Sequence, residues 1–150
     1  MPAWNKVDYR GLLDRQGVAT LLSQSRVGIV TLRPTASYLP SLPVKLFEYM
    51  LAGLPVVASD FPLWRQIVDG AKCGLLVDPL DPEAIAKACQ WLLDRPEEAQ
   101  GMGKRGRAAV IEKYNWSSEA ERLIGFYRGL TGGSQPTSAT VAPRDSTRAA

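Results

Sequence analysis

The sequence predicts an α/β protein in which a doubly wound parallel sheet carries helices on both faces. Short apolar segments rich in β-branched residues alternate along the chain with segments of helical periodicity. These short segments are apolar throughout, not at every second residue, which is typical of strands buried on both faces of a parallel sheet. The length of 150 residues, with 45% apolar and 22% charged residues, is ordinary for one globular domain.

Four segments have the composition of strands. The longest of them is nearly continuous in apolar and β-branched residues, and Gly11 ends a shorter candidate near the N-terminus. The predicted strands are residues 7–10, 27–32, 56–59 and 74–77.

Six segments are predicted to be helices from their apolar spacing and their end signals. Gly53 and Pro55 end the second helix, and Asp81 begins the fourth, with a proline at the first helical position. Ser118 and Glu121 have the spacing of a capping box at the start of the last helix. The predicted helices are residues 16–24, 44–52, 63–68, 82–93, 96–114 and 118–130.

The end of the chain differs in composition from the rest. Residues 131–150 are mainly Gly, Ser, Thr, Ala and Pro, with almost no large apolar residue. Such a segment cannot bury enough apolar surface to fold, so we predict a disordered tail. Residues 1–130 are then expected to form one domain.

Composition excludes several kinds of chemistry. The chain contains no histidine, which excludes His-based triads and His-ligated zinc within it. Cys73 and Cys89 have no metal-ligand spacing, and two cysteines fit free thiols in a reducing cytoplasm. No apolar run approaches the roughly 18 residues that span a bilayer, and no charged-then-apolar leader opens the sequence. We therefore expect a cytoplasmic protein with no metal ion or other cofactor.

The net charge of +3 is modest, and much of the positive charge lies late in the chain. A solvated helix face explains these residues best, with an acidic membrane surface or a polyanion as alternative partners. Nucleic acid is not expected as a partner, because no aromatic residues are interleaved with base-reading side chains. The basic residues are Lys104, Arg105, Arg107, Lys113, Arg122 and Arg128.

The candidate site lies where the loop 33–42 leads into the predicted helix 44–52. Ligands of open parallel sheets bind beyond the carboxyl ends of the strands, and a helix start favours anions. Lys45 and Glu48 follow this start and share one helix face. A surface ion pair between them is the plain alternative. A glutamate beside an anion site is useful where a sugar hydroxyl needs an acceptor, which suggests a nucleotide-sugar pocket.

A glycine motif later in the chain is weaker evidence for a binding site. Gly101-Met-Gly-Lys-Arg-Gly106 has the spelling of a dinucleotide-binding turn. That turn must follow a strand and open a helix, whereas this motif follows Pro96 inside a predicted helix. A nicotinamide-type dehydrogenase is therefore not expected.

Several segments together resemble a known family. The chain resembles the C-terminal, donor-binding domain of GT-B glycosyltransferases of family four, the group 1 glycosyltransferases, with a Rossmann-like fold. The likeness extends from about Val7 to Leu130. The segments that carry it are Ser41-Leu-Pro-Val-Lys-Leu-Phe-Glu-Tyr-Met-Leu-Ala-Gly-Leu-Pro-Val-Val-Ala-Ser59, Cys73-Gly-Leu-Leu-Val-Asp-Pro79, Met102-Gly-Lys-Arg-Gly-Arg107 and Tyr114-Asn-Trp116.

The resemblance implies a donor pocket for a nucleotide-diphosphate-sugar. Glu48 matches a family glutamate that hydrogen-bonds the ribose hydroxyls of the donor. The backbone around Leu42, Pro43 and Val44 would meet the diphosphate, and Lys45 is a contact on the phosphate or ribose side. A second family glutamate, linked to the transferred sugar, falls on a proline here, Pro40, which leaves the donor sugar open. The family usually needs no metal.

The resemblance also implies missing parts. The N-terminal, acceptor-binding domain and the first strand of the donor domain have no counterpart here, so the chain looks like a fragment without its catalytic residues. Strands 7–10 and 56–59 would then pair directly or leave a gap. The implied function is the donor-binding part of a retaining glycosyltransferase that acts on a glycan or lipid-linked acceptor, inactive alone. The alternative is a non-catalytic nucleotide-binding module that completes a partner chain.

Overall fold

The computed structural model describes residues 4–130 and divides into two compact units, with the boundary between Asn115 and Trp116. The first unit holds three strands and all helices but one. Its elements are η1 (Trp4–Lys6), α1 (Arg15–Gln24), β1 (Gly28–Val30), α2 (Val44–Leu51), β2 (Val56–Ser59), α3 (Pro62–Ala71), β3 (Gly74–Val77), α4 (Pro82–Asp94) and α5 (Pro96–Glu112). The second unit contains α6 (Trp116–Leu130).

The three strands form one parallel sheet in the order β1-β2-β3. Gly28 pairs with Val56 at one end of the sheet, and Val56 pairs in turn with Gly74. Every residue of β2 is buried, because a strand lies on each side and helices cover each face. The predicted class, a parallel sheet with helices on both faces, is confirmed.

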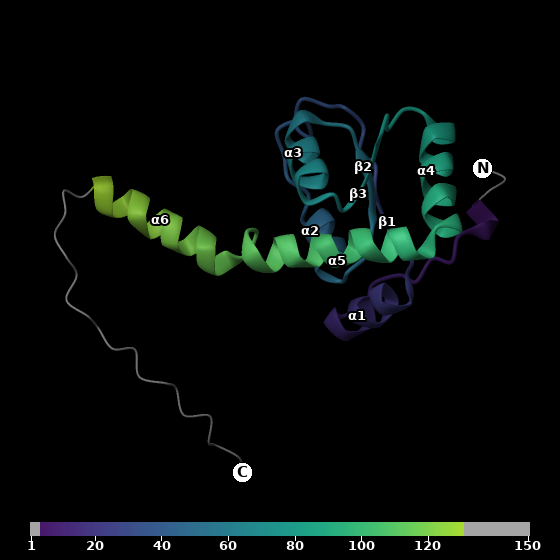
Figure 1. Cartoon of the computed structure of the whole chain (residues 1–150), viewed down its shortest axis with the longest axis horizontal. Helices are drawn as coiled ribbons and strands as arrows, with labels where there is room; N and C mark the ends of the chain where they lie inside the picture. The colour runs from purple at the N-terminus through teal and green to yellow at the C-terminus, as the bar shows by residue number, and fades with distance from the viewer. Residues whose placement is uncertain (1–3, 131–150) are drawn as a thin grey trace, which may run out of the picture. The chain divides into compact units, whose positions relative to one another are not determined.

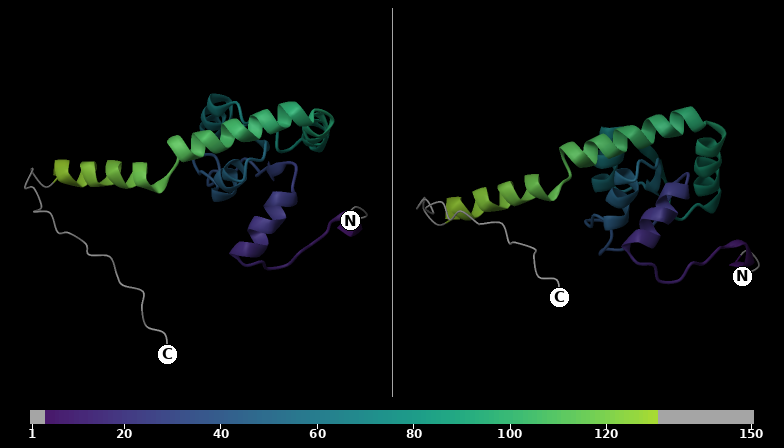
Figure 2. Two further views of the ribbon diagram at one scale, coloured as in Figure 1. Left: turned by 60° about the horizontal axis from the view of Figure 1, so that its bottom comes forward. Right: turned by 90° about the horizontal axis from the view of Figure 1, so that it is seen from below.

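Two hydrophobic clusters fill the two faces of the sheet. Helices α2 and α3 lie on one side of the strands and α4 on the other (Figure 1). Val56 and Ala58 of β2 point into the cluster beneath α2 and α3, whereas Val57 between them points into the cluster beneath α4. This alternation follows from the two-residue period of a strand. Helix α5 runs from α4 on one face to α2 on the other and contributes Ala99 and Val110 to the two clusters (Figures 1 and 2).

The end of α2 sets how closely α5 approaches. Gly53 adopts a left-handed conformation with φ of 77°, and the Leu54 N–H donates to the Tyr49 carbonyl, which closes the helix in a Schellman motif. Gly103 of α5 lies directly against this turn. A Cβ at Gly103 would stand 1.9 Å from the Gly53 oxygen. Gly103 and Gly106 of the glycine motif are therefore packing positions inside α5, in agreement with the rejection of the motif as a nucleotide turn.

Most predicted elements are confirmed, with small shifts at their ends. The strands 56–59 and 74–77 are found at their predicted bounds, and Asp81 caps α4 by accepting from Glu83 N and Ala84 N at 2.9 and 3.0 Å. The predicted strand 27–32 is shorter, at Gly28–Val30. Helix α3 passes the expected stop at Gly70 and ends at Ala71, and its C-cap residue Lys72 has a left-handed φ of 50°.

Two predictions are wrong: the strand at residues 7–10 and the helix cap at Ser118. Residues 7–10 form no strand, because no described strand lies beside them, and the side chains of Val7 and Tyr9 are 52% and 76% exposed. Strand 56–59 accordingly pairs with β1 and β3 and neither pairs with residues 7–10 nor borders a gap. Ser118 does not cap the last helix, since α6 begins at Trp116. The predicted tail, 131–150, lies outside the described residues.

Helix α6 forms a unit of its own. Its residues Glu119 and Arg122 form an ion pair one turn apart, with an N–O distance of 3.0 Å. None of its residues is buried. Its large apolar side chains are exposed, namely Trp116, Leu123, Ile124, Phe126, Tyr127 and Leu130.

The close approach of α5 to the α2 turn predicts that Gly103→Ala destabilises the chain. The added Cβ would collide with backbone, so we expect a loss of about 1–3 kcal/mol or more in the free energy of unfolding. Urea denaturation followed by circular dichroism measures it. The matched control is Gly101→Ala in the same helix, where the Cβ meets only the end of the Arg105 side chain at 3.3 Å. The control should be neutral or stabilising by up to about 1 kcal/mol, as alanine favours helix. Equal stability of the two variants would contradict the packing described.

Candidate functional site

The loop that follows β1 is the longest connection at the carboxyl edge of the sheet. It runs through residues 33–43 to the start of α2, with a turn at 36–40 in which Tyr38 N donates to the Thr35 carbonyl at 3.0 Å. Two contacts from later in the chain hold its ends. The Ser59 hydroxyl hydrogen-bonds Leu32 just before the loop, and the Trp64 indole N–H donates to the Ser41 carbonyl near its end.

The start of α2 has no side-chain cap. Its N-cap residue is Pro43, which has no side-chain group that can accept from the first helical N–H groups. The side chain of Val44 is 71% exposed, and Lys45 is exposed beside it. Uncapped N–H groups and the positive end of the helix dipole both favour an anionic ligand here.

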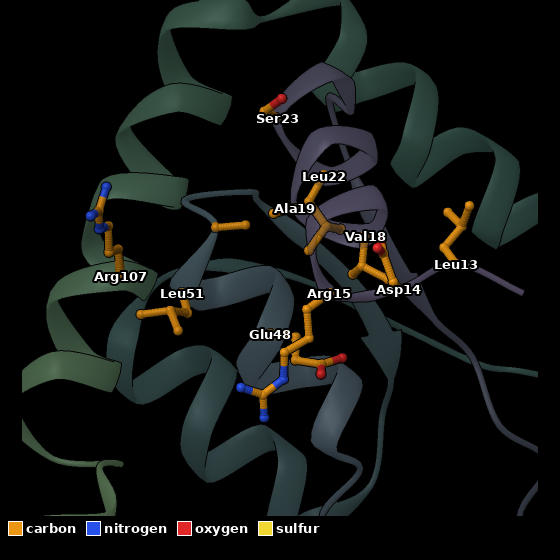
Figure 3. Close-up of a pocket in the computed structure, with 11 residues that line it drawn as sticks. Leu13, Asp14, Arg15, Val18, Ala19, Leu22, Ser23, Glu48, Leu51 and Arg107 are labelled. Carbon is orange, nitrogen blue, oxygen red and sulfur yellow. The ribbon is translucent and has the colours of Figure 1, made fainter. Parts of the chain in front are cut away.

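Glu48 lies one turn further along α2 and lines a cavity of about 680 Å³. The cavity has α1 and the residues before it on one side, the end of α2 on another, and Arg107 of α5 at its margin (Figure 3). In the view of Figure 3, Arg15 and Glu48 occupy the same end of this cavity. The lining residues are Leu13, Asp14, Arg15, Val18, Ala19, Leu22, Ser23, Glu48, Leu51, Ala52 and Arg107.

The predicted site residues therefore fall into two places. Glu48 is a lining residue of the cavity, whereas Leu42, Pro43, Val44 and Lys45 form the exposed helix start and line no part of it. Among residues 4–130, Lys45 and Glu48 form no ion pair with each other, so the plain alternative of a surface ion pair is not what the structure contains. Both charges stay available to a ligand.

The rest of α2 is fixed by packing. Leu46 and Met50 are buried in the cluster beneath the helix, which aims Glu48 outward. Tyr49 packs closely against Gly28, where a Cβ would come within 2.4 Å of the tyrosine ring. Burial, together with the charge of Glu48, raises the pKa of the Tyr49 hydroxyl above its usual value. Tyr49 therefore stays neutral at physiological pH and serves as a packing residue.

A second hollow, of about 370 Å³, lies at the carboxyl ends of the strands. Its lining residues are Pro34, Leu39, Asp60, Phe61, Pro62, Asp78 and Pro79. Both of its carboxylates already have structural partners. Asp60 forms an ion pair with Arg65, and Asp78 accepts from Leu80 N at 2.8 Å in a turn. Asp78 therefore has a turn role, beside the capping role of Asp81.

Several of the late basic residues have structural roles within their own units. Arg105 Nε donates to the Lys72 carbonyl at 2.9 Å, and Lys113 lies 5.1 Å from the centre of the Tyr114 ring. Arg122 pairs with Glu119 in α6. Such partners favour the interpretation of these residues as a solvated helix face.

Within residues 4–130, no helix is long and apolar enough to cross a membrane, and no cluster of three or more Cys, Asp or Glu side chains is arranged to hold a metal ion.

Comparison with known proteins decides the family. The family described as "Glycosyl transferases group 1" matches residues 3–95, more than half of the chain. This chain belongs to that family. The resemblance to the group 1 glycosyltransferases is thereby confirmed, and with it membership of a transferase family.

Individual relatives agree with this assignment. Alpha-D-kanosaminyltransferase of Streptomyces kanamyceticus is 28% identical over 81% of this chain and 32% of its own length. A GDP-mannose-dependent alpha-(1-6)-phosphatidylinositol monomannoside mannosyltransferase of Mycobacterium tuberculosis is 33% identical over 59% of this chain and 23% of its own length. In the solved structure of sucrose-phosphate synthase from Thermosynechococcus elongatus, the match covers 85% of this chain and 31% of the synthase, with a TM-score of 0.74 and 31% identity.

This group 1 chain spans about a third or less of each of these relatives. The matched part of the synthase reproduces the parallel sheet with its helices.

Sequence reasoning missed the wall of the cavity that α1 supplies. The signal that was present is Asp14, three residues before Gly17, whose N–H it caps at 2.8 Å. This places Arg15 at the first position of α1, on the margin of the cavity. Its position opposite α2 could not be read from sequence, because the spacing of Val18, Leu21 and Leu22 predicts a helix but not the element that this helix faces, and α1 buries no residue.

The burial of Cys73 predicts that this thiol is inert in the folded chain. Cys73 is fully buried in the cluster beneath α3, and burial raises its pKa to about 11. Cys89 is only half-buried, and its pKa is raised less strongly. At pH 8, a thiol reagent should label Cys89 first and Cys73 only on unfolding, as mass spectrometry after timed quenching would measure. Labelling of both at the same rate, with the fold intact, would contradict the buried position of Cys73.

Proposed function

We propose that this chain is the donor-binding part of a retaining glycosyltransferase that takes a sugar from a nucleotide-diphosphate-sugar. The observation that carries the proposal is the arrangement on α2: an uncapped, exposed helix start followed by Glu48 at the edge of the 680 Å³ cavity. The acceptor is proposed to be a glycan or a lipid-linked molecule. The name of the mycobacterial mannosyltransferase supports both parts, since it specifies a GDP-mannose donor and a phosphatidylinositol-based substrate.

The spacing on α2 suits a nucleoside diphosphate. The rise from Val44 to Glu48 is about 6 Å along the helix, which is comparable with the length of a ribose 5′-phosphate unit. We assign the diphosphate to the backbone around Leu42, Pro43 and Val44, and the ribose hydroxyls to the Glu48 carboxylate. Lys45 supplies a positive charge beside the phosphates. Glu48 is exposed and pairs with no described cation, so it is free to accept hydrogen bonds from a ligand.

The remaining volume of the cavity suits the rest of the nucleotide. Its apolar lining comes from Leu13, Val18 and Leu51, while Arg15 supplies the polar edge. A base could stack on the apolar part while its edge meets the polar side chains, as is usual for small-molecule sites. The proposal names no donor sugar, because Pro40 offers no side-chain acceptor, and it names no base.

The chemistry assigned to this chain is positioning and charge stabilisation. When the bond between sugar and diphosphate breaks, negative charge grows on the leaving phosphate. A helix start and Lys45 aimed at that charge would stabilise it without rearrangement. We propose that no metal ion or other cofactor is needed and that the protein acts in the cytoplasm, where nucleotide-sugars are made. Contact with a membrane surface would follow only from a lipid-linked acceptor.

The assignment predicts that Glu48→Ala severely weakens donor binding. The loss of a charged acceptor for two hydroxyls costs about 1.5–3 kcal/mol, so the dissociation constant should rise roughly 10- to 100-fold or beyond detection. Isothermal calorimetry of the chain with GDP-mannose and with UDP-glucose measures this. Glu112→Ala is the matched control, because Glu112 is exposed on α5, away from the cavity. Unchanged affinity in the Glu48 variant would refute the assignment.

The proposal also predicts that the purified 150-residue chain binds a donor but transfers no sugar. The groups that hold an acceptor are assigned to an N-terminal half that this sequence does not contain. A radiolabelled donor with a lipid and a glycan acceptor tests for transfer. Sugar transfer by the isolated chain would refute the assignment of acceptor binding to a separate N-terminal half.

The alternative, a non-catalytic module that completes a partner chain, has one observation in its favour. Among the described residues, β1 pairs on one side only, and Ile29 within it is 46% exposed. An unpaired edge of this kind invites another strand. The same assay separates the two functions: transfer restored by a glycosyltransferase N-terminal half favours the enzyme, whereas nucleotide binding without transfer in that assembly favours the module.

A further inference from the structure

We propose that the segment 59–64 is a positioning device for the donor site, with Ser59 and Trp64 fixing the two ends of the 33–43 loop that delivers the start of α2 to the diphosphate. This inference rests on the proposed function, and it adds two residues that do not touch the donor. Neither residue carries charge, and neither lines either cavity described above.

Ser59 holds the beginning of the loop. Its hydroxyl accepts from Leu32 N at 2.8 Å and donates to Leu32 O at 2.9 Å, so a single side chain satisfies both backbone groups of one residue. Ser59 is fully buried and is the sole buried polar side chain within residues 4–130. The neighbouring strand β1 has already ended at Val30. The hydroxyl thus takes the place of the backbone hydrogen bonds that would continue the pairing of β1 with β2, and it fixes where the chain leaves the sheet.

Trp64 holds the other end. Its side chain is fully buried in the core, with its ring centre 4.9 Å from that of Phe61, and its Nε1–H donates to the Ser41 carbonyl at 2.7 Å. Ser41 lies two residues before the N-cap Pro43. The hydrogen bond from Trp64 to Ser41 sets the direction in which the chain enters α2, and with it the direction of the first helical N–H groups.

Between these anchors the loop has little other support. Its other hydrogen bonds are local, such as those from Leu39 N to the Thr35 carbonyl and from the Ser41 hydroxyl to the Tyr38 carbonyl. Most of its side chains are exposed, including Tyr38 and Leu39. A loop with few buried contacts takes its position from the points that tie it down. Both points belong to one short stretch, the end of β2 and the first turn of α3.

The indole N–H distinguishes positioning from simple packing. A phenylalanine at position 64 would keep most of the apolar contacts beneath α3 but would lose the donor to Ser41. The freed carbonyl can then turn to water, and the entry to α2 is no longer fixed. The expected loss is a lowered affinity for phosphate groups, with little effect on the part of the ligand that contacts the cavity.

The experiment compares Trp64→Phe with the unmodified chain. Calorimetry is run with UDP and GDP and with uridine and guanosine. We expect the dissociation constant of the diphosphate that binds to rise about 3- to 10-fold, the effect of one hydrogen bond. Binding of the matching nucleoside should be unchanged. Hydrogen exchange at the Leu46 amide, which donates to the Pro43 carbonyl at 3.0 Å, should speed up in the variant, while that of β2 and β3 stays as it was.

Two further variants complete the test. Ser59→Ala removes the other anchor at nearly constant volume and should give the same pattern, which keeps the inference testable if Trp64→Phe folds poorly. Ile67→Val removes a methylene from the same core cluster beneath α3 without touching the loop, and its diphosphate affinity should match that of the unmodified chain.

The outcomes separate this inference from the proposed function. Normal diphosphate affinity and normal exchange in both anchor variants would overturn the positioning role alone. An equal loss of nucleoside and diphosphate affinity, or the same loss in Ile67→Val, would also overturn it, since that pattern reports general loosening. If the unmodified chain binds neither diphosphate, the proposed function and this inference fail together.

Discussion

Strand β2 is the constraint on which the rest of the first unit depends. It is buried at every residue, with β1 and β3 as its neighbours and a hydrophobic cluster on each face. Because its side chains alternate between α2 and α3 on one face and α4 on the other, it fixes the position of these helices. Its last residue, Ser59, then reaches beyond the ladder to hold Leu32. The strand that organises the core therefore also determines where the 33–43 loop begins.

The site follows from how α2 is held at its two ends. At its C-terminus, the turn at Gly53 accepts the close approach of Gly103, so α5 is locked against α2. At its N-terminus, Pro43 gives the helix no side-chain cap, while the bond from Trp64 to Ser41 sets the chain direction. Leu46 and Met50 are buried between these ends. The helix is thus firmly seated while its start and Glu48 remain open to a ligand, which is the arrangement a binding site requires.

Local signals predicted much of this fold. The continuous apolar runs predicted β2 and β3 at their bounds, and Asp81 followed by a proline predicted the start of α4, because strand burial and helix capping depend on neighbouring residues. The failures involve distant partners. Residues 7–10 have a strand-like composition, yet no described strand lies beside them, and pairing decides whether such a segment becomes a strand. Gly70 was predicted to end the third helix, but α3 continues through it to Ala71, with Lys72 as the C-cap.

The candidate site divides in the same way. Glu48 and the start of α2 could be found from sequence, since a loop, a helix and two charges at fixed spacing lie within one short stretch. Arg15, Ser59 and Trp64 could not. Their contribution depends on contacts across 23 to 27 residues for the loop anchors, and on the placement of an exposed helix for Arg15. Membership of the group 1 glycosyltransferases indicates a donor site but does not by itself say which side chains hold the loop in place.

The most direct measurement of the central claim is an amide NMR titration of the chain with UDP and GDP. If α2 receives the diphosphate at its start, the largest shifts should occur at the Val44 and Lys45 amides, with smaller ones around Glu48 and Arg15. Shifts centred on Asp60 and Asp78 at the other hollow, with Val44 and Lys45 unmoved, would contradict the account.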